Sequence, residues 1–168
     1  MTHDTLPTRP SPDAGTATKI DHIARRLREL EDKEALRGLL TRGWRALDIK
    51  DWDTWSSCWA EDAEFEFGPW GVTRGRAAIR EAVIAAEAAY PAMQHHILNM
   101  HFVIDGDRAT GIGYMWFVAV DDTAEPGRHY DMGGPYEWTF TRTGEGWRMQ
   151  RQALSVAWTS GADTSSSF

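Results

Sequence analysis

One aspartate at the end of a helical pattern is the position best placed for chemistry. Asp48 falls four residues after Trp44, on the same apolar face, so its carboxylate is aimed at the core. There it loses water and faces the negative end of the helix dipole, and both effects penalise its charged form. The alternatives are a surface aspartate on a frayed last turn, or a cap for the segment that holds Trp52.

Two adjacent histidines, His95 and His96, open a long β-like run. Strand side chains alternate between faces, so one of the two points to the concave side in either register. The next residues on the face of His95 are Ile97, Asn99, His101 and Val103, and those on the face of His96 are Leu98, Met100, Phe102 and Ile104. The second set is more apolar, but periodicity does not say which set faces the helices. Taken alone, either histidine is more often a buried or interface residue than a catalytic one.

An inward aspartate beside an inward histidine forms a general acid–base pair. The carboxylate fixes the imidazole tautomer and stabilises its cation. In an apolar pocket the pair can remove a proton next to a carbonyl or deliver one to a departing hydroxyl. His95, His96 and His101 also resemble a metal cluster, but at most two can converge from one strand. We therefore expect acid–base chemistry with no metal and no cofactor.

Apolar periodicity predicts the elements that position these residues. Helical spacing runs from Ile20 to Leu30 and again from Leu36 to Leu47, and tryptophans mark a short helix over residues 52–59. Alternation predicts a strand near 63–67, and a helix follows until Pro91. Four β-like runs then cover residues 93–105, 108–120, 129–142 and 147–158. Two hairpin turns lie at residues 105–107 and 144–146, and Gly133–Gly134–Pro135 predicts a bulge.

Helices followed by long antiparallel hairpins predict an α+β fold. The N-terminal helices would pack on a highly curved, mostly antiparallel sheet that encloses a pocket. We expect one domain over residues 19–160, with a disordered tail at 1–18 and a flexible tail at 161–168. An apolar outer sheet face would need a cover, so we expect a homodimer or homotrimer formed through the sheet.

Composition narrows the class of function. The 168 residues carry a net charge of −7 without a basic stripe, which argues against nucleic-acid binding. No segment reads as a signal peptide or a membrane span, so we expect a cytoplasmic protein without membrane partners. Cys58 is the only cysteine, which excludes an internal disulfide. Nine tryptophans suit a cavity for a flat apolar ligand, and a hydrophobic small molecule is the expected partner.

The sequence resembles the SnoaL-like and scytalone-dehydratase-like proteins of the nuclear-transport-factor-2-like superfamily. The segment Asp48–Ile49–Lys50–Asp51–Trp52–Asp53 is similar to that family's motif around a buried aspartate, and Gln94–His95 before Ile97 is similar to its catalytic-histidine strand. Softer matches are Gly75–Arg76–Ala77–Ala78–Ile79, Asp105–Gly106–Asp107–Arg108–Ala109 and Gly146–Trp147–Arg148. The resemblance spans residues 20–158 and implies a cone-shaped fold.

The resemblance also assigns roles. It matches Asp48 and His95 to the family's Asp–His dyad, which places His95 in the pocket and leaves open a contribution from His96 or His129. The family's active-site tyrosines correspond to Leu47 and Phe67 here, its second histidine to Met115 and its asparagine to Tyr136, so scytalone itself is not the expected substrate. Our candidates for the substrate-binding wall are Trp44, Phe67, Met115, Trp116, Tyr130, Tyr136 and Trp138.

Three functions fit these features. The first is a cofactor-free dehydratase, or other lyase, or a cyclase or isomerase of secondary metabolism, with His95 as general acid–base and Asp48 as its orienter. The second is an epoxide-opening hydrolase or cyclase in which Asp48 acts directly. The third is a non-catalytic binding or accessory protein, which would gain nothing from burying two ionisable groups.

Overall fold

A computed structural model describes residues 14–68 and 71–161. Its helices are α1 (Ala14–Asp48), α2 (Trp52–Ser57) and α3 (Arg76–Glu87). Its strands are β1 (Trp59–Phe67), β2 (Gly71–Arg74), β3 (Ala92–Asp105), β4 (Arg108–Val120), β5 (His129–Thr143), β6 (Gly146–Leu154) and β7 (Trp158–Ser160). The predicted tails at 1–18 and 161–168 fall largely outside the described residues, although α1 already includes residues 14–18.

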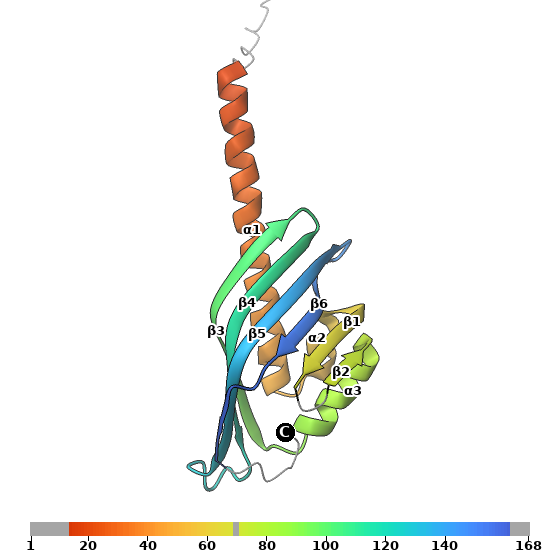
Figure 1. Cartoon of the computed structure of the whole chain (residues 1–168), viewed down its shortest axis with the longest axis vertical. Coiled ribbons are helices and arrows are strands. Elements are labelled where there is room, and N and C mark those ends of the chain that lie inside the picture. Colours follow the sequence, from red (N-terminus) through yellow and green to blue (C-terminus); the bar gives the residue numbers. More distant parts are fainter. Residues whose placement is uncertain (1–13, 69–70, 162–168) are drawn as a thin grey trace, which may run out of the picture.

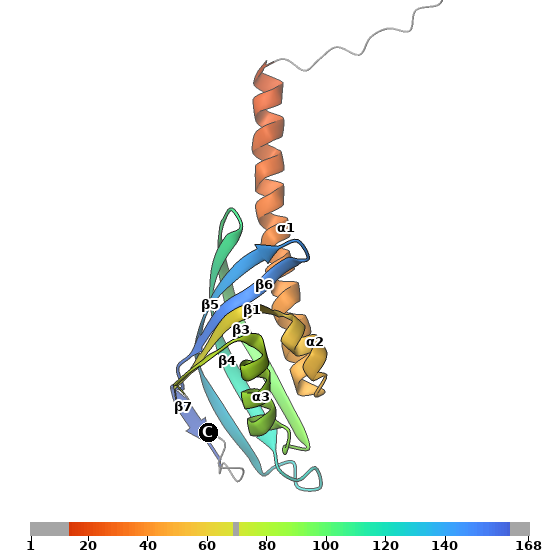
Figure 2. The same cartoon turned by 90° about the vertical axis from the view of Figure 1, so that its right-hand side faces the viewer.

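The described strands form one sheet in the order β2-β1-β6-β5-β4-β3. Strand β7 is not on this path and pairs with residues 131–133, near the start of β5. Among the strands of residues 14–68 and 71–161, only β1 and β6 pair in parallel. The sheet curls without closing, and the C-terminal half of α1 and the shorter helices lie on its concave side (Figures 1 and 2). The predicted α+β architecture, with helices on a highly curved and mostly antiparallel sheet, is therefore confirmed.

The two apolar patterns at the N-terminal end belong to one continuous helix, α1. In its C-terminal part Leu36, Leu40 and Trp44 are buried against the sheet. Its N-terminal part extends beyond the sheet (Figures 1 and 2). No helix in the described residues is both long and apolar enough to cross a bilayer.

Strand β3 contains a bulge that changes which side chains face inward. Its pairing with β4 slips by one residue between Leu98 and His101, and Asn99 takes a positive φ of 53°. Before the bulge the inner face carries His95 and Ile97; after it the inner face carries Phe102. The set that contains His95 therefore faces inward before the bulge, and the set that contains Phe102 faces inward after it.

The bulge predicted at Gly133–Gly134–Pro135 is absent, because the register of β5 against β4 runs through these residues without a break. The glycines have another role. A β-carbon at Gly134 would collide with the carbonyl oxygen of Ser155, and one at Gly133 would collide with the ring of Trp158. The segment after β6 crosses β5 at this point, which requires residues without side chains.

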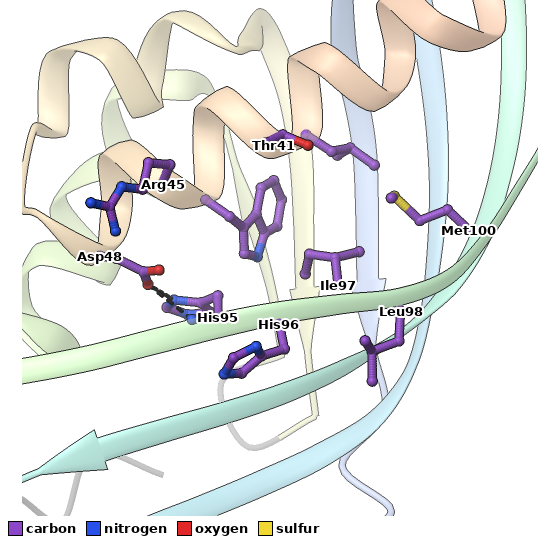
Figure 3. Close-up of a pocket in the computed structure, with 10 residues that line it drawn as sticks. Thr41, Arg45, Asp48, His95, His96, Ile97, Leu98 and Met100 are labelled. Atoms are coloured by element: carbon purple, nitrogen blue, oxygen red, sulfur yellow. Dashed lines mark hydrogen bonds and ion pairs between the residues drawn. The ribbon is translucent and has the colours of Figure 1, made fainter.

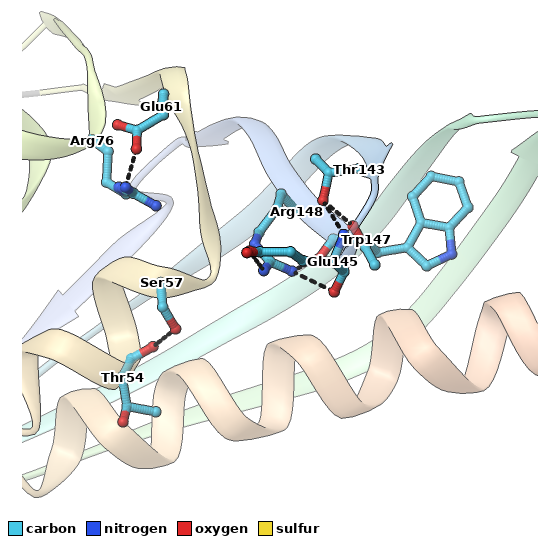
Figure 4. Close-up of polar contacts among 9 residues, drawn as sticks. Thr54, Ser57, Glu61, Arg76, Thr143, Glu145, Trp147 and Arg148 are labelled. Carbon is cyan, nitrogen blue, oxygen red and sulfur yellow. Dashed lines mark hydrogen bonds and ion pairs between the residues drawn. The ribbon is translucent and has the colours of Figure 1, made fainter.

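The β5–β6 hairpin at Gly144–Glu145–Gly146 forms as predicted, with side chains closing the turn (Figure 4). Thr143 Oγ1 donates to the carbonyl of Gly146 at 2.9 Å and accepts from the backbone N–H of Glu145 at 3.2 Å. Arg148 pairs with the Glu145 carboxylate at 2.9 Å. Trp59, expected in the short helix, instead opens β1, which an ion pair between Glu61 and Arg76 ties to the start of α3.

Candidate active site

Asp48 is the last residue of α1, and its side chain turns toward the first half of β3 (Figure 3). One carboxylate oxygen, Oδ1, accepts a hydrogen bond from the backbone N–H of His95 at 2.9 Å. The same oxygen lies 2.8 Å from Nδ1 of the His95 ring. The helix end and the strand are therefore joined through one carboxylate, whose side chain is 12% exposed.

His95 lies on the concave face with only 4% of its side chain exposed. An ionised carboxylate only accepts hydrogen bonds, so Nδ1 carries a proton and donates it to Asp48. The ring packs on Phe117, with 4.7 Å between the ring centroids. Asp48 and Phe117 fix the ring, which leaves Nε2 as the nitrogen able to exchange a proton with another group.

A second carboxylate, which the sequence analysis missed, faces that nitrogen. Glu87 is the last residue of α3 and is 5% exposed. Its Oε1 lies 3.6 Å from Nε2 of His95, and its Oε2 has no hydrogen-bond partner among the described residues. The spacing of the sequence could have indicated that Glu87 is buried, because it lies four residues after Val83 and eight after Ile79, on the buried stripe of α3.

The two carboxylates decide the charge of His95. Burial alone lowers the pKa of this imidazole, but the charge of Glu87 and the hydrogen bond to Asp48 outweigh burial and raise the pKa from 6.5 to about 9. Both carboxylates end helices, where the helix dipole is negative and favours a cation. At neutral pH His95 is an imidazolium.

His95 borders a pocket of about 310 Å³ between the last three turns of α1 and the first half of β3 (Figure 3). This volume is at the small end of the range for ligand sites, about 300–1,000 Å³. The lining is mainly apolar around a few polar groups and consists of Leu40, Thr41, Trp44, Arg45, Asp48, His95, His96, Ile97, Leu98 and Met100. Asp48 and His95 thus both belong to the lining of a small, mainly apolar pocket.

Trp44, which lines this pocket, also meets Tyr136 edge to face, with 5.9 Å between their ring centroids. The Tyr136 hydroxyl donates to the sulfur of Met115 at 3.1 Å. Burial raises the pKa of Tyr136 above its usual value, and the charge of Glu87 adds to this effect. The hydroxyl therefore keeps its proton, which it donates to the Met115 sulfur.

The predicted wall residues lie in three different places. Trp44 lines the pocket beside His95. Met115 and Trp116 border a separate depression of about 340 Å³ near Trp158, where Trp116 is 44% exposed. The remaining four are buried in the aromatic core and line none of the cavities described here: Phe67, Tyr130, Tyr136 and Trp138. Their contact with a substrate stays a prediction.

His96 and His129, whose contribution the resemblance left open, are more exposed than His95. His96 lines the pocket's edge, with 5.6 Å between its ring centroid and that of Trp116. His129 lies 3.4 Å from the carboxylate of Asp131 and has 41% of its side chain exposed. Among the described residues no group of three or more His, Cys, Asp or Glu side chains has the arrangement of a metal site.

The sequence matches the SnoaL-like domain family over residues 28–153, and the chain belongs to this family. No curated protein matches it. Among solved structures it is similar to an NTF2-like protein with a cystatin-like fold from Novosphingobium aromaticivorans, with 28% identity, a TM-score of 0.69, and coverage of 85% of this chain and 92% of the other.

Two further structures share the fold at lower identity. One is named as a scytalone dehydratase of N. aromaticivorans, with 17% identity, a TM-score of 0.73, and coverage of 81% of this chain and 91% of the other. The other is the hexachlorocyclohexane dehydrochlorinase LinA-type3 of Novosphingobium barchaimii, with 16% identity, a TM-score of 0.70, and coverage of 82% and 94%. These two likenesses confirm the predicted fold, and the family match together with the NTF2-like structure at 28% identity confirms the predicted superfamily.

Proposed function

We propose that this protein is a cofactor-free acid–base enzyme that eliminates water from, or isomerises or cyclises, a small hydrophobic cyclic substrate. The observation that carries the proposal is the 2.8 Å contact between Asp48 and the buried His95 at the wall of an apolar pocket. Burying these ionisable groups is costly, and a simple apolar binder would gain nothing from that cost.

The resting charge of His95 sets the order of proton transfers. As an imidazolium, Nε2 first gives its proton to the leaving oxygen of the substrate, and the carbon–oxygen bond breaks with its electron pair on the oxygen. Water leaves, and a carbocation remains. Neutral His95 then takes a proton from the neighbouring carbon, whose C–H electrons form the double bond. This step restores the imidazolium and balances the reaction.

Asp48 acts as a positioning residue in this scheme. It keeps the proton on Nδ1 and stabilises the positive ring, so that only Nε2 exchanges protons. The indole of Trp44 at the pocket presents an aromatic surface to a developing carbocation. Eliminations are also the reactions that the names dehydratase and dehydrochlorinase describe in the two structural relatives.

The experiment is a turnover screen of cyclic tertiary and benzylic alcohols, β-hydroxyketones and epoxides, followed by mass spectrometry. Wild type is compared with His95→Gln, Asp48→Asn and the control His101→Gln, which changes an exposed histidine on the same strand. For an alcohol that loses water, we expect His95→Gln to lower kcat about 100- to 10,000-fold and His101→Gln to leave it unchanged.

Three results would contradict the proposal in different ways. Full turnover by His95→Gln would remove His95 from the mechanism. Turnover of epoxides alone, abolished by Asp48→Asn but retained by His95→Gln, would favour the epoxide-opening reaction. Saturable binding without turnover, unchanged in both variants, would favour a binding protein.

A further inference from the structure

The N-terminal part of α1 carries an apolar stripe that the rest of the described chain does not cover. Ile20, Ile23, Leu27 and Leu30 are 53%, 64%, 53% and 61% exposed. In this part the helix projects past the sheet (Figures 1 and 2). Four large aliphatic side chains in one row on an isolated helix indicate a docking surface.

The stripe is not a continuation of the face that packs on the sheet. At about 100° per residue, its centre lies about 140° around the helix axis from the centre of the buried face formed by Leu36, Leu39, Leu40, Trp44 and Leu47. The domain is therefore on one side of α1 and the exposed stripe is nearly on the other. A partner helix can lie along the stripe without meeting the sheet.

The spacing of the stripe is that of a coiled coil. Successive steps of three, four and three residues put Ile20 and Leu27 at a positions and Ile23 and Leu30 at d positions of two heptads. This 3.5-residue repeat matches another helix of the same repeat better than a flat surface. The flanking g positions are Lys19, Arg26 and Lys33, and Glu31 occupies an e position.

These charges select the orientation of the partner. In a parallel pair of identical helices, Arg26 at g faces Glu31 at e of the other copy, and symmetry forms this ion pair twice. In an antiparallel pair with the same apolar layers, g positions face g positions. That arrangement would put Arg26 opposite Arg26 and Lys19 opposite Lys33.

We propose that residues 19–33 of α1 pair in parallel with the same segment of a second copy of this chain, forming a short coiled coil with the two domains on its outer sides. This interface is separate from the sheet and from the pocket beside His95, so it does not depend on the proposed enzymatic function.

Sedimentation equilibrium of the full chain tests whether the apolar stripe holds two copies together. We expect wild type to dimerise, and the exposed-stripe variant Ile23→Asp/Leu27→Asp to weaken dimerisation at least about tenfold, because charges would replace four stripe side chains in the dimer. The control His22→Asp/Arg25→Asp changes two exposed residues outside the stripe and should dimerise like wild type. Far-UV circular dichroism and the thermal unfolding of the domain should be the same in all three proteins.

Charge reversal tests the orientation. Arg26→Glu and Glu31→Arg should each weaken the dimer several-fold, and the double variant should restore it. Under mild oxidation Leu27→Cys should cross-link to itself, since parallel a positions are adjacent, whereas Arg25→Cys should not. Cys58 is buried and should stay unreactive in both.

Three outcomes would overturn the proposal. One is a wild-type monomer at the highest soluble concentration. Another is a dimer that Ile23→Asp/Leu27→Asp does not weaken, since that dimer must form through another face. The third is a monomer whose helix binds vesicles of anionic lipid, because the stripe would then serve a membrane surface.

Discussion

His95 lies between two helix ends: Asp48, at the end of α1, is 2.8 Å from Nδ1, and Glu87, at the end of α3, is 3.6 Å from Nε2. A neutral imidazole would leave the two buried carboxylates without a cation between them. Protonation of the ring supplies that cation where both helix dipoles are negative. The arrangement therefore keeps Nε2 of His95, the nitrogen that faces Glu87, protonated.

The substitution Glu87→Gln should lower the pKa of His95. Gln keeps the shape of the side chain but removes the charge that contributes most to raising the pKa against burial. In wild type we expect the His95 ring to titrate near 9, and in the variant at a clearly lower pH. NMR titration of the ring protons measures both values without a substrate. Glu81→Gln, an exposed change on the same helix, should leave the titration unchanged.

An identical titration in wild type and Glu87→Gln would show that Glu87 does not set the charge of His95. Once a substrate is known, the same pair of proteins tests the order of proton transfers. If the imidazolium acts first, activity falls as pH rises through the pKa of His95, and Glu87→Gln moves this fall to lower pH. A fall that does not move would contradict the acid-first mechanism.

The raised pKa of His95 also makes stability depend on pH. The folded-state value of about 9 is above the unfolded value of 6.5, so the stabilisation is fully present below about 6.5 and is lost as pH rises through about 9. The loss should be on the order of 3 kcal/mol. Urea denaturation of wild type across this range should show it, and His95→Gln should lack it. Parallel curves for the two proteins would contradict the prediction.

Asp48 was predictable from local spacing because helical periodicity extends reliably to the end of a long, strongly patterned segment. Trp44 and Asp48 share a face, and the structure places the carboxylate at the first half of β3. Alternation alone did not choose between His95 and His96. The reason is the bulge at Asn99, which moves the inner face from odd-numbered to even-numbered residues within one strand.

The burial of Glu87 was not predicted from the sequence. The other side chains that α3 buries are the apolar Ile79, Val83 and Ala86, and a glutamate beside them is expected to face solvent. Only the tertiary contact with His95 explains its burial. The continuity of α1 was missed for a related reason: its two apolar faces point in different directions, so a single helix has the pattern of two.

Gly134 should be sensitive to the smallest substitution. A β-carbon there would meet the backbone carbonyl of Ser155, and backbone cannot move aside as a flexible side chain can. We expect Gly134→Ala to lower the free energy of unfolding by about 1–3 kcal/mol or more. Gly144→Ala is the control, since nothing lies within 4 Å of its β-carbon. Equal melting temperatures for the two variants would mean that the chain does not cross β5 this closely.

Asp32 anchors α1 where the helix leaves the sheet. Its carboxylate accepts from Arg142 at 2.7 Å and from the indole N–H of Trp147 at 3.1 Å, and the guanidinium of Arg142 lies over the Trp147 ring at 4.2 Å. The hydrogen bond from Arg142 is the main cause that lowers the pKa of Asp32 below 3.8. The carboxylate therefore stabilises the fold above about 3.8, and this contribution is lost as pH falls through the lower folded-state value.

The variant Asp32→Ala removes both hydrogen bonds and leaves two donors without their acceptor. We expect a loss of about 1–2 kcal/mol in the free energy of unfolding at neutral pH, and a smaller difference from wild type as the solution is acidified. Urea denaturation at several pH values measures it. Glu29→Gln breaks an exposed pair with Lys33 on the same helix and should change stability little at any pH. If Asp32→Ala behaved like Glu29→Gln, the network at Arg142 would not hold α1 on the sheet, and the projecting part of the helix would begin further along the chain.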